Sequence, residues 1–204
     1  MRAAQAFDVI VDSIKLWWKD WGNQVVVSLI AVLLSLTIIL LPAALFGIYQ
    51  ETLDLTHRER SGLVGFWKGF RHYFLKSLLW GAVNLVVTLV LVTNVWFYYN
   101  SLLEIAPFLT VVTIIIGMFW IIWQVFSLSC FFLQEEKTLK VAWKNGLVIL
   151  IKNPLYVVII SLVVLALLVL SFYLYIPLAF GSIPLITILT LRAVQETIVP
   201  AQTD

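Results

Sequence analysis

The chain contains little charge and almost no cysteine. Only 12% of its 204 residues are Asp, Glu, Lys or Arg, against about 25% in an ordinary soluble domain. Its one cysteine, Cys130, cannot form an intrachain disulfide, and no N-x-Ser/Thr sequon occurs. The low charge excludes a soluble fold, because too few polar residues remain to cover its surface. Nothing in the cysteine or sequon content favours an elaborated extracellular domain.

The residues that most enzyme and metal sites need are also scarce. The two histidines, His57 and His72, fall in basic segments, where contact with solvent or lipid headgroups is their ordinary role. Cys130 lies in an apolar run, and neither histidine is placed to activate its thiol. We therefore expect no catalytic residue, no metal site and no cofactor, and we predict that the protein is not an enzyme. No soluble basic surface of the kind that binds nucleic acid is present.

Hydrophobic runs dominate what the chain does contain. Hydrophobic residues make up 62% of it, and the mean hydropathy is +1.03, which indicates an integral membrane protein. The first run, residues 23–54, is interrupted once by Pro42, which we interpret as a helix break that folds the run into a hairpin. A second break is expected at Pro177. The predicted fold is all-α, with about six membrane segments at residues 24–41, 43–56, 78–98, 108–133, 155–175 and the stretch after Pro177.

Three amphipathic segments precede these hairpins, at residues 3–21, 61–76 and 137–152, and Gly22-Asn23 is expected to end the first of them. Each combines an apolar stripe at helical spacing with basic residues, which is typical of helices that lie in the membrane interface. Each also contains a Trp-Lys pair, a combination suited to the headgroup region. The residues expected to contact lipid or a partner are Trp17, Trp18, Lys19, Trp67, Lys68, Arg71, Trp143 and Lys144.

These elements form one unit that is repeated three times along the chain. We expect a single membrane domain over residues 1–204, with units 1–60, 61–136 and 137–198 and a short tail, 199–204. Each unit would hold an interfacial helix, an outward span and an inward span. Internal repeats are common in transporters, but plain structural duplication is the preferred interpretation.

The basic residues indicate an orientation for this arrangement. With six segments, all thirteen Lys and Arg residues lie on one face, and the opposite loops hold only Glu104. The positive-inside rule then places both termini and the three interfacial helices in the cytoplasm. A five-span alternative, with an uninterrupted first helix, would divide the basic residues between the two faces.

Polar residues inside the apolar segments are the remaining candidates for function. Asn84 and Gln124 are predicted to make intramembrane polar contacts between helices, with a substrate path as the alternative. Glu51 and Asp54 lie one helical turn apart, and we interpret them as a solvated helix end in preference to a proton or cation site. No span carries a charged residue at its centre, which argues against an ion-coupled pump.

Three stretches resemble a known family. They are LPAAL at 41–45, FWKGFR at 66–71 followed by Phe74, and AWKN at 142–145 followed by Asn153-Pro154. In these the chain resembles the YesL family of bacterial integral membrane proteins, grouped as domain of unknown function 624. The resemblance implies a multi-pass protein of the bacterial inner membrane, often encoded near carbohydrate uptake systems and without an established activity.

The leading hypothesis is a non-enzymatic accessory or scaffold protein of a membrane system, plausibly sugar uptake. Its expected partners are the lipid bilayer, anionic headgroups and a membrane transport complex. The alternative is a small oligomeric transporter or channel for an unknown solute, which would use Asn84 and Gln124.

Overall fold

The computed structural model describes residues 3–57, 62–174 and 181–198, and these form nine α-helices and no strand. Pro177 and the tail at 199–204 lie outside the described residues. The all-α prediction is confirmed. The helices are α1 (Ala3–Lys19), α2 (Trp21–Ser35), α3 (Leu41–Thr56), α4 (Gly62–His72), α5 (Phe74–Tyr99), α6 (Ala106–Leu133), α7 (Leu139–Lys152), α8 (Pro154–Leu174) and α10 (Ser182–Ile198).

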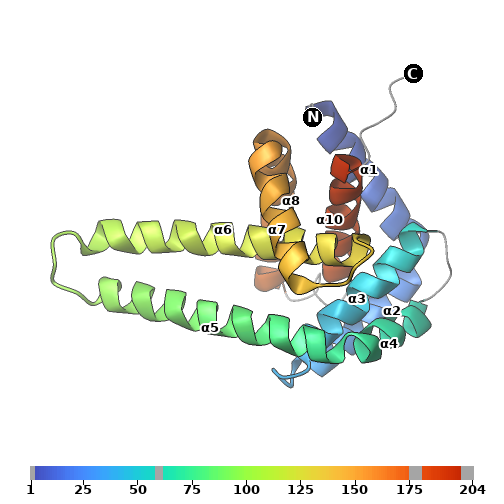
Figure 1. Ribbon diagram of the computed structural model, residues 1–204, viewed down its shortest axis with the longest axis horizontal. Helices are drawn as coiled ribbons and strands as arrows, with labels where there is room; N and C mark the ends of the chain where they lie inside the picture. The colour runs from blue at the N-terminus through green and yellow to red at the C-terminus, as the bar shows by residue number, and fades with distance from the viewer. Residues whose placement is uncertain (1–2, 58–61, 175–180, 199–204) are drawn as a thin grey trace.

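Helices α5 and α6 form a long antiparallel hairpin that projects from the rest of the molecule (Figure 1). They contain 26 and 28 residues, which corresponds to roughly 40 Å of helix each. Their sides expose aliphatic residues along most of this length, as expected for helices surrounded by lipid. With α8, they are the three described helices that are long and apolar enough to cross a bilayer, which supports a membrane-embedded protein.

Three candidate spans are fewer than the six that the sequence predicts. The other expected segments are α2, α3 and α10, with 15, 16 and 17 residues. At 1.5 Å per residue they reach roughly 22–26 Å, less than the hydrocarbon thickness of about 30 Å. In the case of α2, the helix ends at Ser35, not near position 41, and a turn occupies residues 36–40.

The predicted hairpin at Pro42 is nevertheless formed by α2 and α3. Pro42 occupies the second position of α3, where its missing N–H would have had no partner within the helix. The chain therefore turns before the proline, and the proline begins the returning helix.

The three amphipathic segments appear as α1, α4 and α7, with shifted boundaries. The first was expected to end at Gly22-Asn23, but α1 ends at Lys19 and both residues lie inside α2. The second was expected to continue to residue 76, but α4 ends at His72, and Tyr73 separates it from α5.

Helix α3 is the centre of the molecule, because twelve of its sixteen residues are buried. It contacts α2, α4, α5, α6 and α10. An aromatic cluster surrounds Phe46, whose ring centroid lies 5.3 Å from that of Phe131 and 5.5 Å from that of Phe132. Such rings contribute specific packing energy in addition to buried area.

Glycines let α4 lie directly on α3. A Cβ atom at Gly69 would lie 2.4 Å from the Cβ of Gln50, and one at Gly47 would lie 2.8 Å from the ring of Phe66. Only glycine allows the two backbones to approach this closely. One face of α4 is thereby fixed, and its other face is turned outward.

The candidate spans do not share one direction. Helix α8 runs crosswise to the α5–α6 hairpin, in the part of the molecule that also holds α1 and α10 (Figure 1). Helices that cross a bilayer tilt by about 20° on average. If the hairpin crosses near the normal, α8 in this arrangement lies far more tilted than an average span.

Candidate functional site

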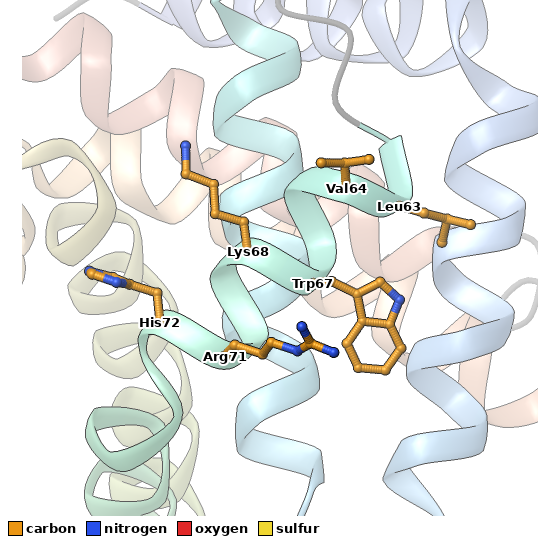
Figure 2. Close-up of a pocket in the computed structure, with 6 residues that line it drawn as sticks. All are labelled: Leu63, Val64, Trp67, Lys68, Arg71 and His72. Atoms are coloured by element: carbon orange, nitrogen blue, oxygen red, sulfur yellow. The ribbon is translucent and has the colours of Figure 1, made fainter.

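The outward face of α4 carries three sequence-predicted site residues that are all exposed, Trp67, Lys68 and Arg71. Gly65, Phe66 and Gly69 are buried on the α3 side. The opposite side forms a shallow depression of about 790 Å³ (Figure 2), lined by Leu63, Val64, Trp67, Lys68, Arg71 and His72.

This depression is cationic and partly aromatic. Lys68 and Arg71 are exposed, and residues 62–72 include no acidic residue. The guanidinium carbon of Arg71 lies 5.9 Å from the ring centroid of Trp67, within the range of a cation–π contact. Figure 2 shows Arg71 turned toward Trp67, whereas Lys68 and His72 project away from that pair. Two separate cationic groups and an indole are therefore available to an anionic partner or to lipid headgroups.

The Trp-Lys pairs of α1 and α7 differ from the Trp67-Lys68 pair of α4. Trp18 is 68% exposed beside the exposed Lys19, as an interfacial anchor would be. Trp17 instead donates its indole N–H to the carbonyl oxygen of Gly181 over 3.1 Å and so fastens α1 internally. Helix α1 packs on α8 and α10, while α4 packs on α3, so the pairs belong to different parts of the molecule.

Trp143 faces the interior, while its neighbour Lys144 is exposed. Its indole N–H donates to Oε1 of Gln124 over 3.1 Å, and its carbonyl oxygen accepts the indole N–H of Trp123 over 2.9 Å. Trp143 thus holds α7 against α6. The expectation that it contacts lipid or a partner has no support from this placement.

Asn84 and Gln124 lie together between α5 and α6. Asn84 donates to Oε1 of Gln124 over 3.4 Å, and its own Oδ1 accepts the indole N–H of Trp120 over 3.0 Å. Asn84 also donates to the carbonyl oxygen of Trp80, its own helix one turn earlier. These contacts engage both side chains in fastening the hairpin, the ordinary use of amides inside a membrane.

The interpretation of Glu51 and Asp54 as a solvated helix end is wrong. Glu51 is 1% exposed and Asp54 is 7% exposed, and α3, which carries both, packs against α2, α4 and α10. Asp54 accepts a hydrogen bond of 2.6 Å from the side-chain amide of Gln50. Burial, followed by the negative charge of Asp54, raises the pKa of the nearby Tyr73.

Gln24 is the residue that the sequence analysis missed, and it is fully buried. Its side-chain amide donates to Oε1 of Glu51 over 2.8 Å and so joins α2 to α3. A signal was present in the sequence: Gln24 and Ser28 are polar residues one helical turn apart in an otherwise apolar helix. Such spacing places both on one face.

Among the described residues, the reactive side chains form neither a disulfide nor a metal-binding group. Cys130 is buried and forms no disulfide, and His72 is exposed on α4. Among the residues that the structure describes, no three His, Cys, Asp or Glu side chains are grouped in a way that could hold a metal ion.

No protein-family model, no curated protein and no solved structure matches this chain significantly. The resemblance to the YesL family therefore stays a prediction.

Proposed function

We propose that the chain is a non-enzymatic accessory protein of the bacterial inner membrane, which docks a partner of a transport system through the outward face of α4. The observation that carries this proposal is the exposed set of Trp67, Lys68 and Arg71 on a helix whose opposite face is fixed to α3. A rigidly held cationic and aromatic surface is suited to recognising an acidic segment. The resemblance to the YesL family supports the membrane and the link to carbohydrate uptake.

The test is site-specific photo-crosslinking in native membranes, with the crosslinking residue at position 68. We expect one discrete protein adduct, and its yield should fall several-fold in an Arg71→Gln background. The matched control places the crosslinker at Tyr99, which is exposed at the far end of the hairpin. Adducts with lipid alone at position 68 would reduce α4 to a membrane anchor and refute the docking function.

The topology that belongs to this proposal has six membrane segments, three pseudo-repeated hairpins and cytoplasmic termini. The bias of basic residues and the α2–α3 hairpin support it. In a Cys130→Ser background, single cysteines at the fully exposed Leu102 and at the exposed Lys140 test whether α6 crosses. We expect a membrane-impermeant maleimide to label position 102 from outside and position 140 only after permeabilisation. Labelling of both from the same side would contradict it.

The rival function, a small oligomeric transporter or channel, depends on Asn84 and Gln124. Asn84 is occupied by Trp120 and a backbone carbonyl, and Oε1 of Gln124 accepts from Trp143 and Asn84, whereas Nε2 of Gln124 has no partner among the described residues. The bonded atoms link helices to one another, which favours a structural role. We therefore do not adopt transport through this pair.

A further inference from the structure

The carboxyl group of Glu51 is buried without a described cation beside it. Its Oε1 accepts the hydrogen bond from Gln24, whereas its Oε2 has no partner. The ion pairs among the described residues are Lys15 with Asp12 and Arg192 with Asp12, and neither involves Glu51. A buried carboxylate with a single neutral donor is unfavourable unless a positive charge or a proton compensates it.

Two oxygen atoms of α2 also lack partners among the described residues. Oε1 of Gln24 and Oγ of Ser28 are buried and unpaired, and both residues are 0% exposed. Oε1 of Gln24 belongs to the same amide as the donating Nε2, and Oε2 of Glu51 belongs to the same carboxyl group as the accepting Oε1. Both free oxygens therefore lie close to that hydrogen bond. Ser28 follows one turn later on the same face of α2.

Among the described residues, the charged groups around this cluster do not supply the missing positive charge. Those that act on Glu51 are Asp20 and Asp54, and both are acidic; Arg58 and Arg60, which follow α3, lie outside the described residues. On α10, Arg192 is directed to Asp12 of α1. On α4, Lys68 and Arg71 lie on the outward face, away from α3.

We propose that Glu51, Gln24 and Ser28 form a binding site for a monovalent alkali cation between α2 and α3. Hard cations take oxygen ligands from carboxylates, amide carbonyls and hydroxyls, and these are the three unpaired groups. One positive charge balances the carboxylate of Glu51, which is 1% exposed. The site lies apart from the outward face of α4, so this inference is independent of the proposed docking function.

The test measures thermal unfolding of the full-length protein in detergent by its tryptophan fluorescence. NaCl is compared with choline chloride at equal ionic strength, so that screening is the same in both. A ligand that binds only the folded state stabilises it, and we expect saturating Na⁺ to raise the Tm by about 5 °C. Radioactive sodium retained by the purified protein provides a second, direct readout.

Variants assign the effect to this site. Glu51→Gln removes the charge but keeps the shape, and it should abolish both the Tm rise and sodium retention. Ser28→Ala should raise the half-saturating Na⁺ concentration several-fold, and it decides the matter if Glu51→Gln fails to fold. Asp8→Asn, which changes an exposed acid of α1, is the matched control and should respond as the original chain does.

Three outcomes would overturn the proposal. The first is a Tm that does not respond to Na⁺, K⁺ or Li⁺. The second is an unchanged response in Glu51→Gln. The third is a Tm that depends on pH but on no alkali cation, because a proton would then compensate the carboxyl group.

Discussion

The contact between α3 and α4 predicts a large effect from adding a single methyl group. In the variant Gly69→Ala, the new Cβ would lie 2.4 Å from the Cβ of Gln50 and 2.9 Å from the carbonyl oxygen of Phe46. Carbon atoms in contact are about 3.5–4.0 Å apart. Neither obstructing atom can rotate away, because one is a backbone oxygen and the other is bonded directly to the backbone. The two helices must therefore separate by roughly 1 Å or more.

The magnitude follows from two opposed terms. Overpacking of this kind costs about 1–3 kcal/mol, and the better helix propensity of alanine returns up to about 1 kcal/mol. We expect a net loss of about 1–2 kcal/mol, which lowers the Tm of a chain of this size by about 2–8 °C. Thermal unfolding in detergent, followed by tryptophan fluorescence, measures the change.

A matched control separates packing from propensity. Gly22 also lies in a helix, but a Cβ there meets nothing within 4 Å. Gly22→Ala should leave the Tm unchanged or raise it slightly, because only the propensity term applies. If Gly69→Ala is as stable as Gly22→Ala, α4 does not lie on α3 as described, and the argument for a rigidly held outward face fails with it.

Other perturbations give smaller, distinct signals. Asn84→Leu removes the acceptor of the Trp120 indole, so we expect a loss of about 0.6–2 kcal/mol in detergent unfolding; unchanged stability would show that the network is not formed. Asp12→Asn breaks the ion pair with Arg192, in which both side chains are partly exposed, and it should change the unfolding free energy by less than about 1 kcal/mol. Cys130 is 1% exposed, so the folded protein should resist maleimide and become labelled only on denaturation; rapid labelling by a small permeant maleimide would contradict the packing of α6.

The sequence predicted the helices whose apolar residues recur at helical spacing or form a long uninterrupted run. The amphipathic stripes of α1, α4 and α7 predicted their existence, and the long apolar runs predicted α5, α6 and α8. The ends were less certain, as Gly22 illustrates. It was expected to terminate a helix but lies within α2, because a glycine terminates a helix only where the backbone takes a left-handed turn.

The lengths of the shorter helices were not predictable in this way. Residues 36–40 are as hydrophobic as α2 itself, so hydropathy alone extended the first segment across the turn that they form. In a soluble protein, polar turn residues usually mark such a point. A chain that places its turns in or near lipid has little reason to change composition there, and the boundary has to come from packing.

Burial of charge shows the same dependence on packing most clearly. Glu51 lies near the end of a short apolar helix. The sequence alone predicts that such a position is adjacent to water, where a charge costs little free energy. Burial is instead imposed by packing, because α3 contacts its sequence neighbours α2 and α4 and also α10, which comes from the far end of the chain. The residue that reveals this is Gln24, since a glutamine inside an apolar helix needs a polar partner and the nearest one across the hairpin is Glu51. For a membrane chain, a polar residue placed among apolar ones therefore says more about buried sites than the charges at the helix ends.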